Sequence, residues 1–260
     1  MSRSLDERAE LRKLAHTLDS DESRLTMLAG VPAEDVRTLR AQAGEAMFQA
    51  GRPAFARVAT LSKTLPTAVA AKLTVLTLPP LLAARVAELL EPARAADMVA
   101  KLPDAYLADV SSVLDPARAP EVVAAIPDDR VAAVSAELGR RREWVVISGF
   151  VSHVPPAALR ASIAVFDGEQ LVRIGFLIDD EAKLDAIAEM LADGQVEQML
   201  TATVDHELWA ELGDIVEHLS DERLTRMAGY YRATDALHAP FEAAAASGEL
   251  EKAALARLAG

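Results

Sequence analysis

Residues 90–111 read LEPARAADMVAKLPDAYLADVS, and residues 114–135 read LDPARAPEVVAAIPDDRVAAVS. Shifting the chain by 24 positions lays the first stretch on the second with twelve identical residues. Conservative pairs, such as Asp97 with Glu121, extend the match. A fixed period of this length is typical of helical-repeat proteins. The chain therefore contains a true internal repeat.

Prolines divide this repeat at alternating intervals of 13 and 11 residues. They are Pro79, Pro92, Pro103, Pro116 and Pro127. Proline suits the first turn of a helix, because the amide hydrogen that it lacks has no partner there. Apolar residues follow each proline at helical spacing; after Pro103 they are Leu107, Val110 and Leu114. Each interval therefore predicts one short helix of about 10–12 residues.

Such short helices need neighbours, since even good helix formers are marginal below about 12–15 residues. Two of them joined by a tight turn cannot bury their apolar faces alone, so the hairpins must stack. The apolar-polar alternation of β-strands is nearly absent from the chain. The predicted fold is therefore all-α, an α-solenoid of roughly 24-residue hairpin repeats.

The period divides the chain into three predicted segments. Residues 1–61 form an N-terminal helical cap, residues 62–232 the helical-repeat domain, and residues 233–260 an Ala-rich C-terminal helix or mobile tail. Four helices are expected near the N-terminus, at residues 4–18, 20–29, 32–50 and 53–65. Later helix starts are expected near Pro155-Pro156, Asp167, Asp179-Asp180, Asp193-Gly194, Asp205 and Ser220. Asp167 with Gln170 has the form of a capping box.

Two segments are apolar on nearly all sides, Trp144–Val151 and Leu171–Ile178. Helices of this kind are covered on more than one face, so both should be central. Neither approaches the about 20 apolar residues that cross a bilayer. The charged start of the chain also lacks the apolar core of a secretory signal. We therefore expect a cytoplasmic protein with no membrane insertion.

The proline-started acidic pairs, with phrases such as Leu102-Pro103-Asp104-Ala105-Tyr106-Leu107, resemble the cytosolic N-terminal domain of the MgtE magnesium-channel family. The helical middle domain of the flagellar motor switch protein FliG has a related pattern. The resemblance covers residues 62–232 and implies a right-handed superhelix of short helices. In that family the domain regulates a channel by closing against a neighbouring domain when magnesium binds. It implies here a free-standing relative of a regulatory module, and no magnesium-site residue is carried over.

Composition excludes several classes of function. The chain has no cysteine, so it is neither a disulfide scaffold nor a zinc-thiolate protein. Its 40 Asp and Glu against 27 Lys and Arg give a formal charge of −13, which repels nucleic acid. No Gly-x-Ser-x-Gly motif, glycine-rich phosphate loop or zinc-spaced histidines occur. We therefore expect no enzyme, no catalytic residue and no bound cofactor.

One group of side chains has the composition of a metal site. On an expected helix from Asp205 to Leu219, the residues Glu207, Glu211, Asp214 and His218 share a face. Three carboxylates and an imidazole could hold Mg²⁺ or Mn²⁺, although such ions usually need oxygen ligands from a second element. The alternative is an acidic helix face in solvent.

Aromatic and basic residues are candidates for partner or ligand binding. Trp144 and Trp209 could each anchor a partner, because indole combines a large apolar area with one polar group. The cluster Arg140-Arg141-Arg142 could dock an acidic partner, and Tyr230-Tyr231 could form an interface. The alternatives are core packing for the four aromatic residues and solvated charge for the arginines.

The leading hypothesis is a non-catalytic helical-repeat protein that acts as a protein–protein interaction or regulatory module. Its partner would be an unidentified protein or a second copy of the chain. A first alternative is an apolar or acyl small molecule held in a cavity between the central helices. A second alternative is a regulator that responds to divalent cations.

Overall fold

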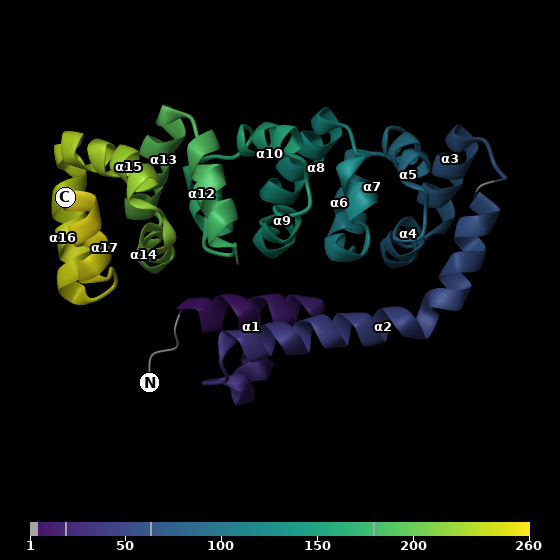
Figure 1. The fold of residues 1–260 in the computed structure, drawn as a ribbon, viewed down its shortest axis with the longest axis horizontal. Coiled ribbons are helices and arrows are strands. Elements are labelled where there is room, and N and C mark those ends of the chain that lie inside the picture. The colour runs from purple at the N-terminus through teal and green to yellow at the C-terminus, as the bar shows by residue number, and fades with distance from the viewer. Residues whose placement is uncertain (1–4, 19, 63, 179) are drawn as a thin grey trace. The chain divides into compact units, whose positions relative to one another are not determined.

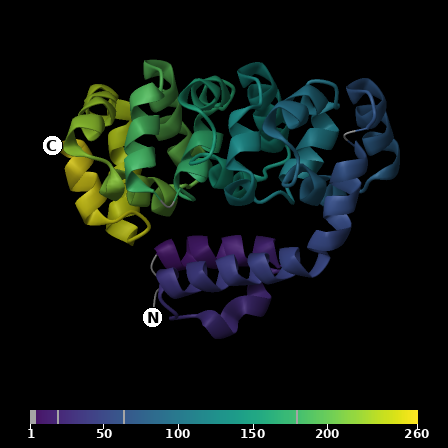
Figure 2. The same cartoon turned by 45° about the vertical axis from the view of Figure 1, so that its right-hand side comes forward.

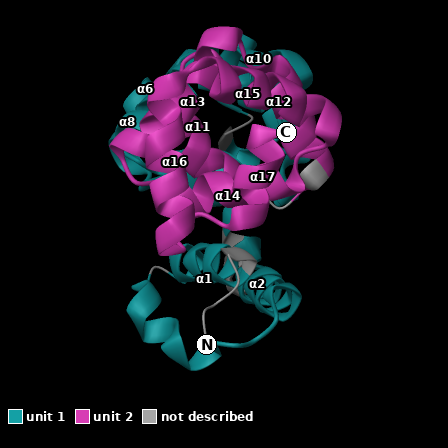
Figure 3. Cartoon of the chain, turned by 90° about the vertical axis from the view of Figure 1, so that its left-hand side faces the viewer, with its two compact units in different colours: residues 1–162 teal, residues 163–260 magenta. Residues whose placement is uncertain are grey.

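The computed structural model is helical throughout its described part. The described residues are 5–18, 20–62, 64–178 and 180–260. They form seventeen α-helices and two 3-10 helices and contain no strand, which confirms the predicted all-α fold. The chain divides into two compact units, residues 1–162 and residues 163–260 (Figure 3).

Unit 1 begins with a short helix, a 3-10 turn and one long helix, and continues with a series of short ones. Its elements are α1 (Leu5–Thr17), η1 (Glu22–Leu28), α2 (Ala33–Ser62), α3 (Thr67–Thr77), α4 (Pro80–Ala87), α5 (Pro92–Val99), α6 (Asp104–Ser111), η2 (Pro116–Arg118), α7 (Pro120–Ala124), α8 (Asp128–Arg140), α9 (Trp144–Phe150) and most of α10 (Pro156–Ile163).

The repeat helices of unit 1 stack in two rows (Figures 1 and 2). In one row α2 packs on α4, α4 on α6 and α6 on α8; in the other α3 packs on α5 and α5 on α7. Each helix thus contacts the second helix along the chain, as stacked hairpins require. This arrangement agrees with the prediction that each short helix needs neighbours in the stack.

Prolines start the repeat helices as predicted, with one exception. Pro80 and Pro92 occupy the first helical turn of α4 and α5, and Pro103 and Pro127 are the N-caps of α6 and α8. After Pro116 the chain makes only the 3-10 turn η2, and α7 starts again at Pro120.

Pro120 explains the interruption. Its counterpart one repeat earlier is Ala96, inside α5. A proline at that place in a continuous helix would remove a backbone hydrogen bond and clash with the preceding turn. The helix therefore begins at Pro120 itself.

The N-terminal prediction is wrong in two respects. Residues 32–50 and 53–65 were expected as two helices, but α2 is a single helix that contains Pro53. Figure 1 shows that α2 is bent rather than broken, as a proline inside a helix allows. Residues 20–29 form the 3-10 helix η1 instead of an α-helix.

Unit 2 continues the short-helix pattern. After the end of α10 its elements are α11 (Gly168–Gly175), α12 (Glu181–Met190), α13 (Asp193–Asp205), α14 (Trp209–His218), α15 (Asp221–Ala233), α16 (Asp235–Ser247) and α17 (Lys252–Ala259). Asp167 and Gln170 form the predicted capping box of α11. Asp180 caps α12, and Asp179 lies outside the described residues.

The C-terminal segment is helical and part of the core. Helices α16 and α17 pack against α14 and α15 within unit 2. They bury Leu237, Phe241 and Leu258, and Phe241 and Leu258 have no exposed surface. Residues 233–260, predicted as an Ala-rich helix or a mobile tail, form α16 and α17.

One device recurs along both units: a side chain of one helix caps the C-terminal end of the third helix before it. In unit 1, Tyr106 on α6 donates to the Leu78 carbonyl after α3, and Arg130 on α8 to the Leu102 carbonyl after α5. These two residues are 24 positions apart, one repeat. Among the described residues of unit 2 the same contact occurs three times. Gln195 on α13 caps the end of α10, Arg226 on α15 the end of α12, and Arg257 on α17 the end of α14. Each supplies a hydrogen bond to carbonyls that have no partner within their own helix.

Candidate functional site

Helix α3 has its larger apolar side chains on the outside. Its buried residues are Ala70, Ala71 and Thr74, which face the rest of unit 1. Val69, Leu73 and Leu76 lie on the nearly opposite side at i, i+4 and i+7, and all three are exposed. Leu76 keeps 70 % of its surface in solvent, whereas Ala71 keeps 2 %. The helix therefore presents an apolar stripe outward, and we call Val69, Leu73 and Leu76 the α3 stripe.

Further exposed large apolar side chains occur in the sequence on either side of the stripe. Most exposed large apolar side chains of the described residues fall in this part of the chain: beyond the α3 stripe they are Val58, Leu61, Leu65, Val75, Leu81 and Leu82. In the described part of unit 2, only Val165 is of this kind. Monomeric proteins rarely expose apolar side chains in such concentration unless something binds them.

Charge around the stripe differs from the rest of the chain. Residues 46–87 contain no Asp or Glu, although the chain as a whole carries a formal charge of −13. Arg52, Arg57 and Lys72 are exposed in this segment. The α3 stripe therefore has the exposed Lys72 on its own helix and no acidic residue in the sequence that flanks it. An anionic partner would be attracted to such a surface.

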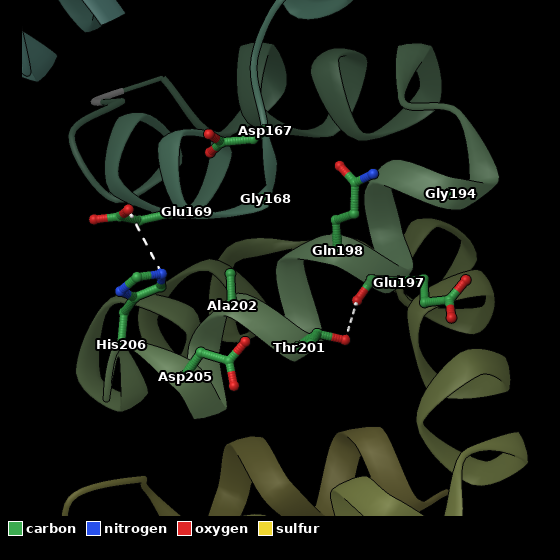
Figure 4. Close-up of a pocket in the computed structure, with 10 residues that line it drawn as sticks. All are labelled: Asp167, Gly168, Glu169, Gly194, Glu197, Gln198, Thr201, Ala202, Asp205 and His206. Carbon is green, nitrogen blue, oxygen red and sulfur yellow. Dashed lines mark hydrogen bonds and ion pairs between the residues drawn. The ribbon is translucent and has the colours of Figure 1, made fainter. Parts of the chain in front are cut away.

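Unit 2 contains a polar pocket of about 520 Å³ between the start of α11 and the side of α13 (Figure 4). Its lining residues are Asp167, Gly168, Glu169, Gly194, Glu197, Gln198, Thr201, Ala202, Asp205 and His206. The two helices approach closely because Gly168 has no side chain: a Cβ there would lie 2.2 Å from the Gln198 carbonyl oxygen. The pocket thus lies beside the close contact between α11 and α13 and is open to solvent.

Several polar groups of the pocket already have internal partners. Asp167 caps the helix by accepting a hydrogen bond of 2.9 Å from the backbone amide of Gln170. Glu169 pairs with Arg173 at 2.8 Å and approaches His206 Nε2 at 3.6 Å. These contacts cap the start of α11 and pair opposite charges within unit 2. The polar groups of the pocket are therefore those expected where two helices meet.

The predicted metal ligands are not brought together. The helix expected from Asp205 starts at Trp209, and Glu207 lies in the preceding turn with a φ of 54°. Glu207 therefore leaves the helix face that Glu211, Asp214 and His218 occupy on α14. His218 Nδ1 instead lies 2.8 Å from the Asp214 carbonyl oxygen. Within the described ranges, no three His, Asp or Glu side chains are grouped so as to hold a metal ion.

The arginine cluster is largely engaged within unit 1. Arg140 binds Glu137 with Nη2 at 2.7 Å, and Arg141 binds Glu137 at 2.8 Å and Asp109 at 2.5 Å. The two guanidinium groups lower the pKa of Glu137 to about 2. Arg142 is exposed and has a φ of 61°. Arg141 thus ties the end of α8 to Asp109 on α6, whereas Arg140 pairs within α8.

The aromatic candidates divide between core and surface. Trp209 and Tyr231 are buried and both contact Phe241, at ring-centroid distances of 5.1 and 5.2 Å. They close the core of unit 2 and are inaccessible as anchors for a partner. Trp144, at the start of α9, and Tyr230 are half-buried.

The sequence pattern did not predict the α3 stripe. Its signals are the acid-free composition of residues 46–87 and the split of α3 into an alanine side and a leucine-valine side. Hydrophobic spacing alone cannot say which side faces the core, because either could do so.

The central apolar segments also form helices as predicted. In α9, Val146 and Ile147 are buried, and in α11 Leu171, Val172 and Ile174 are. The first helix belongs to unit 1 and the second to unit 2.

Among the described residues, no helix combines the length and the apolar content needed to cross a bilayer. Comparison with protein-family models, with curated proteins and with solved structures gave no match. The geometry of the chain itself is therefore the basis for assigning a function.

Proposed function

We propose that this protein is a non-catalytic helical-repeat module that docks another protein at the α3 stripe. One observation carries the proposal: α3 buries alanine and presents leucine and valine to solvent. Burying a leucine side chain contributes about 1.5–3 kcal/mol, so this arrangement favours association with a partner that covers the stripe.

Two further features support the proposal. Stacked helical repeats ordinarily end in a helix with a polar outer face. Helix α3 is the first member of its row, and its outer face is apolar. The resemblance of residues 62–232 to a cytosolic regulatory module supports the same role and a cytoplasmic location.

The experiment compares wild-type protein with a Leu73→Glu/Leu76→Glu double variant as baits in an extract of the source cells. We expect a stoichiometric protein partner on the wild-type bait and its loss on the double variant. Because both leucines are exposed, each substitution should change the free energy of unfolding by no more than about 0.5 kcal/mol. Thermal melting of the two baits checks that the variant remains folded.

Val165→Glu is the matched control, since Val165 in unit 2 is 44 % exposed, close to the 43 % of Leu73. This variant should retain the partner. Identical protein sets on the wild-type and double-variant baits would show that the α3 stripe is not the docking surface.

A further inference from the structure

The row that contains α3 has room for one more helix. In the other row α2 precedes and contacts α4, but the described chain puts no helix before α3 in its own row. Helix α5 covers the alanine side of α3, where Arg94 of α5 donates to the Leu65 carbonyl at 2.6 Å. The α3 stripe lies on the nearly opposite side, at the place of the missing row neighbour. The surface therefore has the form that receives a helix.

Spacing along the stripe favours the same occupant. Val69, Leu73 and Leu76 repeat at four and three residues, which is the seam spacing of helix–helix packing. An amphipathic helix lays such anchors against a matching face. An extended strand would need unpaired backbone groups at a sheet edge, and the described residues form no sheet.

Charge identifies the chemistry of the occupant. Lys72 lies next to Leu73 on the edge of the stripe and is exposed. No carboxylate occurs between residues 46 and 87 to pair with a basic partner. Asp or Glu beside the apolar seam of the incoming helix would be placed to pair with Lys72.

A second copy of the chain fits less well. Two α3 stripes facing each other would bring the two copies of Lys72 together, and residues 46–87 supply no carboxylate to pair with them. Unit 2 of another copy is acidic, with 20 Asp and Glu against 7 Lys and Arg, but its described residues expose only Val165 among large apolar side chains. It therefore offers the charge without the apolar seam.

We propose that the α3 stripe binds an amphipathic helix of a partner protein, with leucine-like anchors along one face and Asp or Glu beside them. The helix takes the vacant place before α3 and extends its row. This inference rests on the proposed docking function and names the class of partner.

Three designed helical peptides test the inference on the full-length protein. Each has three heptads with Leu at the seam positions, and the flanking e and g positions are all Glu, all Gln or all Lys. Dye-labelled peptides are titrated with wild-type protein and followed by fluorescence anisotropy. We expect the Glu peptide to bind at least tenfold more tightly than the Lys peptide, with the Gln peptide between them.

Variants of the protein separate the apolar and the charged contributions. Leu73→Glu/Leu76→Glu should weaken binding of the Glu peptide at least tenfold, and Val165→Glu should leave it unchanged. Lys72→Glu should reduce the preference for the Glu peptide over the Lys peptide. Circular dichroism of each variant verifies the fold.

Four outcomes overturn the inference: no binding of the Glu peptide, equal or tighter binding of the Lys peptide, stripe-dependent self-association in light scattering, or stripe-dependent binding of the protein to vesicles of anionic lipid in place of the peptide. The bait experiment above keeps the two proposals apart. A natural partner lost on the stripe variant, together with failure of the Glu peptide, would leave docking intact and refute only the acidic helix.

Discussion

At the scale of single residues, Gly168 sets the distance between α11 and α13. A Cβ at this position would meet backbone atoms of Gln198 at 2.2 and 2.3 Å, so one of the two helices must move. We predict that Gly168→Ala lowers the free energy of unfolding by about 1–3 kcal/mol, the usual cost of overpacking. Urea denaturation measures the change.

Gly194 supplies the control, because it lines the same pocket but a Cβ there meets nothing within 4 Å. Gly194→Ala should leave stability unchanged or raise it by up to about 1 kcal/mol. Equal losses for the two variants would mean that the close approach of α11 and α13 is not what Gly168 provides.

Glu137 connects single-residue electrostatics to the acid stability of unit 1. Hydrogen bonds from Arg140 and Arg141 lower its pKa from 4.5 to about 2. A carboxylate whose folded pKa is lowered stabilises the fold above pH 4.5, and this contribution is lost as the pH falls from 4.5 to about 2. We predict that Glu137→Gln flattens the dependence of unfolding free energy on pH within that window.

The measurement is denaturant unfolding of wild-type and variant protein at a series of pH values. Glu121→Gln is the comparison, since Glu121 is exposed on α7 in the same unit. It should retain the wild-type slope. An unaltered slope in Glu137→Gln would assign the acid sensitivity to other carboxylates.

At the scale of elements, hydrogen bonds from one helix to the carbonyl end of another stabilise helices that are too short to be stable alone. Arg257 on α17 donates to the carbonyls of Val216, Glu217 and Leu219 at the end of α14. Hydrogen bonds from a charged donor contribute about 1.5–3 kcal/mol, so Arg257→Ala should lower the free energy of unfolding by about 2 kcal/mol. Chemical denaturation of the full-length variant tests this value.

Lys252→Ala is the matched control, because Lys252 is an exposed cation on the same helix. It should change stability by less than about 0.5 kcal/mol. A similar effect of the two substitutions would argue that general charge, rather than capping of α14, accounts for the result.

The elements also show what sequence patterns can predict. Proline positions located α4, α5, α6 and α8 because proline acts locally, through a missing amide and a fixed φ. The same reasoning failed at Pro53, where α2 continues, because only the surrounding structure decides whether a proline bends a helix or ends it.

The candidate site was less predictable than the helices. The turn at Glu207 depends on a positive φ that the sequence does not signal, since the residue is not glycine. The outward stripe of α3 depends on which neighbours the helix has, and spacing within α3 cannot specify them. Sequence patterns therefore predict features that depend on local chemistry, and they do not predict features that depend on how helices pack.

At the scale of the whole molecule, charge and apolar exposure are distributed unevenly between the units. Residues 163–260 hold 20 acidic and 7 basic residues, which equals the entire formal charge of −13, and residues 1–162 hold 20 of each. The exposed apolar side chains are concentrated at α3 and its neighbours in unit 1. Acidic surface favours solubility, whereas the α3 stripe favours association.

Site-specific photo-crosslinking in the source cells tests the docking role of α3 most directly. A benzophenone amino acid is placed at position 76 in the stripe or at position 201, where Thr201 is exposed on α13 of unit 2. We predict one dominant crosslinked protein from position 76, none from position 201, and loss of the product when Leu73→Glu is added. Absence of a crosslink at position 76, or the same products from both positions, would contradict it.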